Sequence, residues 1–354
     1  MLCVRYVSAK TSRLPLTEIN DFATEMKKNR YIHIVILSLL LALSAGVNSQ
    51  EVPGPDENIP FLITFGRQGA ETSWGDDDFS QTFFFTIPKD YKDPFYIRIY
   101  DADIGGKTDE LNNFWNTRMV YSVFGGKGCY TDPQAKGIDP SGNYKSGTML
   151  ATRTFGMDNK LDERWFTFGP FNPADGEYYS KFSSNVFKII CDGVSGDDGN
   201  LYRYALSRRS DANVPIEGAN AFTYEYTFRM WNNNDTSFVS HIYPYIDSGC
   251  IYIKQRNFDW DNDGEFVVVS VERKGQSMPL SGEDQWVDDR MPILDAEIGK
   301  SLDFRFYKKR GELVRNNNVV MTVENQYGEN LQFFSAPIGG VPVYKPRITV
   351  RPKK

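Results

Sequence analysis

The feature that most constrains this fold is the alternation of apolar and polar side chains in many short segments. In TYEYTFRM, residues 223–230, three aromatic side chains and one Met alternate with Thr, Glu and Arg. A period of two is typical of a β-strand with one buried face. The same pattern, rich in β-branched and aromatic residues, recurs in FYIRIYD, NVFKIIC, LYRYAL, CIYIKQ, EFVVVSVE, SLDFRFYK and VVMTVE. Turn-forming clusters separate these segments, and no convincing helical period follows residue 49, so we expect an all-β fold of antiparallel sandwiches.

Chain length and one polar segment indicate two domains. The chain after residue 49 is longer than most single domains. The segment WNNNDTS, residues 231–237, interrupts the strand pattern, which restarts at FVSHIYPYI. We therefore predict a larger β-sandwich, C2-like or jelly-roll-like, over 58–231. An immunoglobulin-like sandwich of about seven strands is predicted over 238–350.

Residues 1–49 are expected to be an over-called start followed by a signal peptide. A basic cluster at 27–30 precedes an apolar run over 32–45 and then small and polar residues, which is the layout of a secretory signal. Met26 directly precedes the basic cluster. The apolar run is shorter than the roughly 20 residues that span a membrane, and a retained signal anchor is the alternative. We expect an exported protein that is periplasmic, secreted or on the outer membrane surface, with no later transmembrane span.

The net charge excludes one class of partner, and the number and spacing of the cysteines limit the possible disulfide bonds. The whole chain has 40 Lys and Arg against 46 Asp and Glu, and its first 49 residues hold six and three of these, so the remainder carries a net charge of −9. Such a surface repels nucleic acid. Cys129, Cys191 and Cys250 are an odd, widely spaced set and not a disulfide framework. One bridge between Cys129 and Cys191 is permitted in an oxidising compartment, and a buried free thiol at Cys191 is equally compatible.

The motif DWDNDG is a candidate calcium loop. Asp259, Asp261 and Asp263, followed by Gly264, match the first half of an EF-hand loop, where alternate carboxylates converge on one cation. The twelfth position is Ser270 instead of Glu, and the flanks are strands. We therefore predict a hairpin metal loop completed from elsewhere in the chain, with an ordinary polar turn as the alternative.

A second acidic cluster occurs in IYDADIGGKTDE. Asp101 and Asp103 follow a predicted strand, and Asp109 and Glu110 return after a glycine pair. Four acidic groups on one loop are unfavourable unless a cation or full hydration compensates them. We expect these four residues to bind Ca²⁺, as in the loops at the tip of C2-like sandwiches.

Catalytic motifs are missing from the sequence. His241 is the single histidine after residue 49, which excludes His-rich zinc sites and leaves any Ser-His-Asp triad dependent on it. We expect His241 to be structural and the protein to be no enzyme. A glycoside hydrolase, which needs two suitably spaced carboxylates, stays open as the alternative.

Three tryptophans lie in polar, loop-like surroundings: Trp74, Trp115 and Trp231. An exposed indole could stack on a sugar, so Trp74 and Trp115 are candidate ligand-binding residues. The alternative is that these rings are packing anchors.

Long stretches of the chain resemble the N-terminal exported region of large outer-membrane-protein-A-like envelope proteins of Bacteroidetes-type bacteria. The stretches are FLITFGRQGAETSWGDDDFSQTFFFTIPKDYKDPFYIRIYDADIGGKTDE, YKSGTMLATRTFG, FTFGPFNPADGEY, FKIICDGVSGDDGNLYRYALS and NFDWDNDG. The resemblance implies export and a β-sandwich, and it names no ligand residue. We therefore expect a non-enzymatic envelope or surface adhesion protein with calcium-stabilised loops that binds an envelope protein or a glycan. The alternative is a carbohydrate-active enzyme or glycan-binding module that uses the loop carboxylates and tryptophans.

Overall fold

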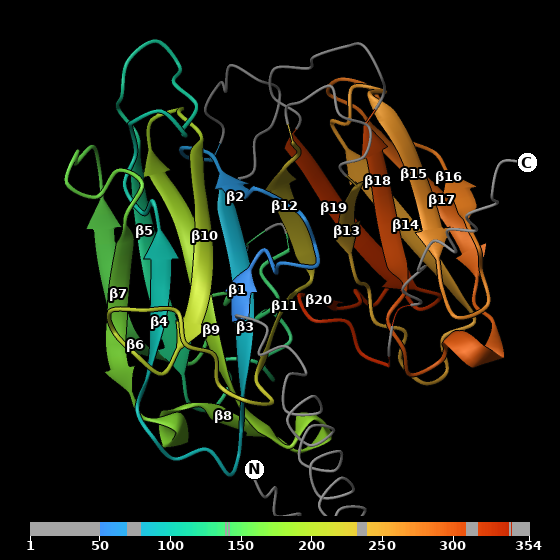
Figure 1. The fold of residues 1–354 in the computed structure, drawn as a ribbon, viewed down its shortest axis with the longest axis horizontal. Coiled ribbons are helices and arrows are strands. Elements are labelled where there is room, and N and C mark those ends of the chain that lie inside the picture. Colours follow the sequence, from blue (N-terminus) through green and yellow to red (C-terminus); the bar gives the residue numbers. More distant parts are fainter. Residues whose placement is uncertain are drawn as a thin grey trace, which may run out of the picture. The chain divides into compact units, whose positions relative to one another are not determined.

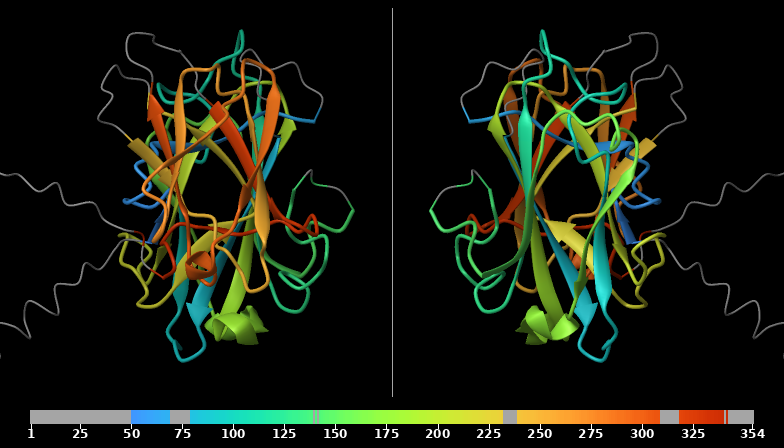
Figure 2. Two further views of the ribbon diagram at one scale, coloured as in Figure 1. Left: turned by 90° about the vertical axis from the view of Figure 1, so that its right-hand side faces the viewer. Right: turned by 90° about the vertical axis from the view of Figure 1, so that its left-hand side faces the viewer.

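The computed structural model describes residues 50–68, 79–138, 140, 142–231, 239–308, 318–339 and 341. These residues are mainly strands and connecting turns, with three short 3-10 helices, η1 (Pro173–Asp175), η2 (Ser180–Phe182) and η3 (Asp295–Glu297). The expected all-β sandwich is confirmed, because antiparallel sheets pack against one another and none of those described closes into a barrel (Figures 1 and 2).

The largest sheet has nine strands in the order β17-β14-β19-β12-β2-β10-β4-β7, with β1 paired to β10. The strands are β1 (Gln50–Val52), β2 (Phe61–Thr64), β4 (Phe95–Tyr100), β7 (Trp165–Phe171), β10 (Asn200–Ser207), β12 (Glu225–Arg229), β14 (Tyr252–Phe258), β17 (Trp286–Pro292) and β19 (Asn318–Asn325). Figure 1 shows β2 beside β12 within this sheet.

Two smaller sheets complete the described fold. One has the order β20-β11-β3-β9-β5-β6, with β8 paired to β9, and the other has the order β13-β18-β15-β16. The strands of the first are β3 (Ser80–Pro88), β5 (Arg118–Gly125), β6 (Thr148–Phe155), β8 (Glu177–Tyr179), β9 (Ser184–Ser195), β11 (Asn220–Thr223) and β20 (Phe333–Phe334). Those of the second are β13 (Val239–Ile242), β15 (Gly264–Val269), β16 (Gln276–Met278) and β18 (Asp303–Lys308).

One hydrophobic core connects all three sheets. The ring centroid of Phe83, on β3, lies 5.8 Å from that of Tyr204 on β10 and 5.6 Å from that of Tyr226 on β12. Phe228, also on β12, packs against Phe306 on β18 with centroids 6.0 Å apart. The nine-stranded sheet therefore contributes to two sandwiches, one with each smaller sheet. Each buried aromatic ring removes roughly 150–250 Å² from water, which explains the high Phe and Tyr content.

The segment predicted as one strand over 223–230 is divided between two sheets. Thr223 ends β11, which pairs with β3 and β20, whereas Glu225 begins β12, which pairs with β2 and β19. The Thr223 hydroxyl oxygen lies 2.7 Å from the Thr82 carbonyl oxygen and 2.6 Å from that of Glu225, so its single O–H can donate to either at this corner. Tyr224, at the corner, packs in a second cluster with Phe84 and Phe222.

The division into domains over 58–231 and 238–350 stays a prediction. Its boundary at 231–237 lies, apart from Trp231, outside the described residues. Strand β12 pairs with β2 on one side and with β19 on the other, so hydrogen bonding continues from one range into the next. No helix within the described residues is long and apolar enough to span a membrane, and the expected signal peptide lies outside those residues.

Cys129, Cys191 and Cys250 are buried free thiols. Cys191 lies in the main core, whereas Cys129 packs in a different cluster with Phe124 and donates to the Val186 carbonyl at 3.3 Å. The bridge considered between Cys129 and Cys191 is therefore not formed. Burial raises the pKa of both thiols to about 12, which keeps them protonated at neutral pH.

Glu57 is a carboxylic acid inside the core, on the segment that leads into β2. The backbone N–H of Gly54 and the Tyr226 hydroxyl donate to it, the latter at 3.0 Å. Burial is the main cause that raises the pKa of Glu57 to about 8. The side chain is therefore largely protonated at neutral pH in the folded protein.

Replacement of Glu57 by Gln should reduce the pH dependence of stability. In the unfolded chain this Glu releases its proton near pH 4, whereas in the fold it holds the proton until about pH 8. The folded state thus binds more protons between these values, and the free energy of unfolding falls as pH rises through this window. The free energy of unfolding, measured in urea at several pH values, should depend less steeply on pH for Glu57→Gln than for the wild type. Glu217→Gln, at an exposed position, is the control and should keep the pH dependence of the wild type. If the free energy of unfolding varies with pH equally in the wild type and in Glu57→Gln, this account is refuted.

Candidate metal centre

Three carboxylates converge where β4 ends and β7 begins. Asp101 and Asp103 are buried, Asp162 is half-buried, and each offers an oxygen within 4.8 Å of the other two. Oxygens bound to one calcium ion at 2.3–2.6 Å can be at most about 5 Å apart. The three side chains could therefore hold one metal ion.

Antiparallel pairing of β4 with β7 brings these residues together, because the end of one strand meets the start of the other. Directly after β4, the Asp101 N–H donates to the Arg164 carbonyl at 2.9 Å. Asp101 Oδ1 in turn accepts the Glu163 N–H at 2.9 Å, and Asp103 Oδ2 accepts the Asp158 N–H at 3.0 Å. Each of these two aspartates thus has one oxygen fixed by a backbone donor.

The glycine pair of the first loop folds closely over Asp162. Gly106 has a φ of 72°, which side-chain-bearing residues rarely adopt. A Cβ added at this position would lie 3.2 Å from Cγ of Asp162. Glycine therefore lets the loop approach the third carboxylate.

The electrostatics of the cluster favour neutralisation of its carboxylates, either by a proton or by a bound cation. Burial, with the negative charge of Asp162 as a further cause, raises the pKa of Asp101 to about 6 and that of Asp103 to about 7. Neither Asp103 Oδ1 nor Asp162 Oδ1 has a hydrogen-bond partner in the described part of the chain, although both atoms are buried. A buried acceptor without a donor is destabilising. Because the ligands are all oxygens, a hard cation such as Ca²⁺ or Mg²⁺ suits the cluster.

Asp109 and Glu110, which were predicted to bind the same ion, lie outside the triad and contact other groups of the protein. Asp109 accepts the Gly105 N–H at 2.8 Å and the Leu201 N–H at 2.7 Å, one on each oxygen, and so holds its loop against β10. The buried Glu110 forms an ion pair with Arg229 of β12. Two of the four predicted ligands therefore converge, and two stabilise the loop.

Asp162 was not among the predicted ligands, because it lies far along the chain from Asp101 and Asp103. Its local signal is an acidic segment, MDNKLDE, which only Arg164 separates from the aromatic strand WFTF. That signal becomes informative once β4 is known to pair with β7.

The DWDNDG motif does not gather its three carboxylates. Asp263 Oδ2 lies 2.6 Å from Nζ of the buried Lys308 on β18. The lysine ammonium, and not a metal ion, therefore supplies the positive charge beside Asp263. Asp259 Oδ1 accepts the Asp284 N–H at 2.8 Å. Within the described residues, Asp259, Asp261 and Asp263 form no group whose oxygens converge on one point.

This motif instead makes a tight turn over the core. Asp259 and Asp261 have φ values of 55° and 57°, in the left-handed region that Asp tolerates better than most residues. Trp260 between them is buried, and its ring stacks on Phe306 with centroids 4.6 Å apart. A Cβ at Gly264 would lie 2.2 Å from the Tyr307 carbonyl oxygen, so glycine permits the close approach of β15 to β18.

The remaining candidates have separate positions. Trp74 lies outside the described residues, and Trp115 is half-buried in the loop before β5. Trp231 Nε1 donates to the Asn58 carbonyl at 2.7 Å, as expected for a packing anchor.

His241 Nδ1 lies 2.7 Å from Asp303 Oδ1, and Arg305 Nε is 2.6 Å from the other oxygen of Asp303. These contacts to Asp303 are consistent with the expected structural role of His241.

Fold and site together define an all-β sandwich protein with an acidic triad suited to a metal ion. No protein-family model matches the chain, and no curated protein matches it. Among solved structures, the CUB1-EGF-CUB2 domain of human MASP-1/3 matches with 10% identity and a TM-score of 0.19, covering 74% of this chain and 99% of that one. PNGase F, a glycosylasparaginase from Flavobacterium meningosepticum, matches with 7% identity and a TM-score of 0.19, covering 79% and 96%. These values are too low to assign a family or a function.

Loss of Lys308 should destabilise the protein more than loss of a lysine whose acidic partner is exposed. Lys308→Met leaves a buried Asp263 without its counter-charge, which typically costs about 3–5 kcal/mol of unfolding free energy. Lys254→Met is the matched control, because its partner Asp288 is largely exposed and such pairs contribute about 0–1 kcal/mol. Urea unfolding at neutral pH measures both. The double variant Asp263→Ala/Lys308→Met should recover part of the loss, and equal costs for Lys308→Met and Lys254→Met would contradict this interpretation.

Proposed function

We propose that this chain is an exported, non-enzymatic adhesion protein of the cell envelope or surface, in which Ca²⁺ orders one loop pair. The ion would lie between Asp101, Asp103 and Asp162. The observation that carries the proposal is the convergence of these carboxylates around two buried oxygens that lack hydrogen-bond partners in the described chain. A divalent cation would satisfy both oxygens and remove the repulsion between the carboxylates.

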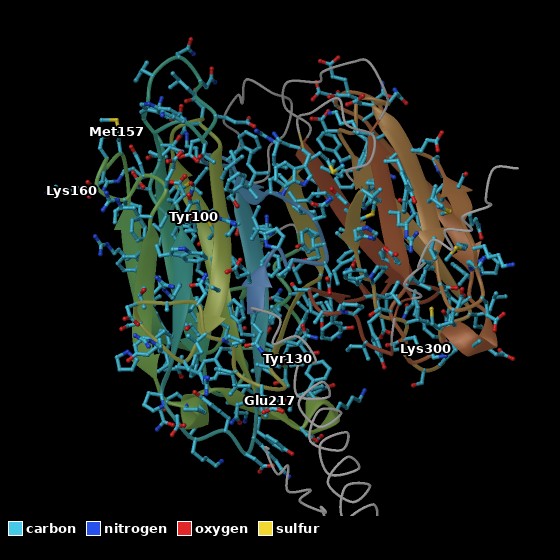
Figure 3. All side chains as sticks on the ribbon, in the orientation of Figure 1. Tyr100, Tyr130, Met157, Lys160, Glu217 and Lys300 are labelled. Carbon is cyan, nitrogen blue, oxygen red and sulfur yellow. The ribbon has the colours of Figure 1, made fainter. Side chains whose placement is uncertain are left out.

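The surroundings of the triad fit a role in contact with a partner. Met157 and Lys160, labelled in Figure 3, lie on the loop that carries Asp162, and the Met157 side chain is 61% exposed. A Cβ at Gly105 would lie 3.4 Å from Cγ of Met157, so this apolar side chain borders the glycine turn. An ion that fixes both loops would also fix this surface. An envelope protein or a glycan is the proposed partner, in keeping with the signal-like N-terminal sequence and the resemblance to envelope proteins.

Calcium should raise the thermal stability of the protein. A ligand at a hundred times its Kd stabilises the folded state by about 2.7 kcal/mol, which corresponds to a rise of several degrees in Tm for a protein of this size. Scanning calorimetry in EDTA and then in excess CaCl₂ measures this shift. Equal concentrations of MgCl₂ show whether the site prefers the larger cation.

Isosteric variants test whether the calcium-induced rise in Tm comes from the acidic triad. Asp103→Asn and Asp162→Asn should each remove most of the calcium-induced shift, because each deletes one anionic ligand and keeps its shape. Asp90→Asn, at an exposed turn before β4, is the control and should keep the full shift. The calcium proposal fails if wild-type protein shows no shift, or if Asp103→Asn and Asp162→Asn shift as much as Asp90→Asn.

A further inference from the structure

Two adjoining pockets lie beside β20, the edge strand of the seven-stranded sheet, and its neighbour β11. Their volumes are about 610 and 400 Å³, and both are lined by Lys181 of η2 and by Asp247. Volumes of roughly 300–1,000 Å³ are typical of sites for small organic ligands. In Figure 3, Tyr130 of the smaller pocket is well separated from Met157, so these pockets are distinct from the acidic triad.

Aromatic rings line both pockets. In the larger one, Phe334 lies 5.8 Å from Tyr245 and 6.2 Å from Phe182, measured between ring centroids. In the smaller one, the hydroxyls of Tyr130 and Tyr224 lie 3.2 Å apart. Hydrogen bonding fixes this tyrosine pair. Phe334 and Tyr224 are buried, so the aromatic surface open to a ligand comes from the half-buried rings of Tyr245 and Phe182 in the larger pocket and of Tyr130 and Tyr179 in the smaller one.

Two charged residues at the junction of the pockets, Lys181 and Asp247, are the ones placed to meet a ligand, whereas Asp132 and Glu329 already accept hydrogen bonds from Asn143 and Asn325. Lys181 and Asp247, at the junction, take part in none of the ion pairs found among the described residues. The ammonium of Lys136 lies over the Tyr224 ring, 4.6 Å from its centroid. Asp247 is half-buried, and this desolvation, followed by the nearby charge of Glu329, raises the pKa of its carboxyl group. Such groups are placed to exchange hydrogen bonds with a polar ligand.

We infer that the two pockets form one binding site for a neutral oligosaccharide. The C–H face of a pyranose ring packs on aromatic side chains, while its hydroxyls donate to carboxylates and accept from ammonium and amide groups. Asp132, Asp247 and Glu329 outnumber Lys136 and Lys181 in the lining, which disfavours an anionic glycan. The same charged residues disfavour a wholly apolar ligand. The shared residues Lys181 and Asp247 would bond to sugar units on both sides of the junction.

A glycan array tests this site with short neutral cello-, chito-, manno- and xylo-oligosaccharides as probes. Wild-type protein should bind at least one of these series. Titration calorimetry with that oligosaccharide should show about tenfold weaker binding for Tyr245→Ala, which removes one stacking face, and for Asp247→Asn. The matched controls are Tyr252→Ala, a half-buried tyrosine on β14, and Asp90→Asn. Both should bind as wild type.

Two further outcomes decide the inference. Binding should persist in EDTA, because the site lies apart from the triad, so the result does not depend on the calcium proposal. If Tyr245→Ala fails to fold, the isosteric Asp247→Asn variant decides alone. The inference is overturned if wild-type protein binds none of the probes, if EDTA abolishes binding, or if the pocket variants bind as tightly as the controls.

Discussion

The pairing of β12 with both β2 and β19 is the constraint on which the rest of the structure depends. It makes one nine-stranded sheet serve two sandwiches, so that Tyr226 faces Phe83 while Phe228 faces Phe306. A single hydrophobic core can then stabilise both. Because the framework is fixed by non-local hydrogen bonds and buried rings, its loops can carry groups that are unfavourable on their own.

The acidic triad is the clearest such case. Pairing of β4 with β7 places Asp101 and Asp103 beside Asp162, in a position where burial and mutual repulsion favour protonation. The buried Asp263 is neutralised in a different way, because the side-chain ammonium of Lys308 lies beside it and forms an ion pair. The protein thus neutralises one buried aspartate internally, and we propose that a divalent cation neutralises the triad.

Local periodicity was enough to predict the strands, because alternation reports directly which side chains face a core. It could not predict the passage from one sheet to another at Tyr224, since both strands have the same period. The DWDNDG motif misled for a related reason. Asp, Asn and Gly suit both a metal loop and a tight turn, and only the distant Lys308 distinguishes the two. The place of Asp162 in the triad likewise required tertiary information, whereas spacing at a strand end was enough to predict that Asp101 and Asp103 lie together.

The most direct test of the calcium site is a crystal structure of the protein grown with calcium and measured at a wavelength where calcium scatters anomalously. The account predicts one anomalous peak between the three aspartates, about 2.3–2.6 Å from an oxygen of each. It is contradicted if calcium at saturating concentration leaves this position empty, or if the peak lies at the DWDNDG turn instead.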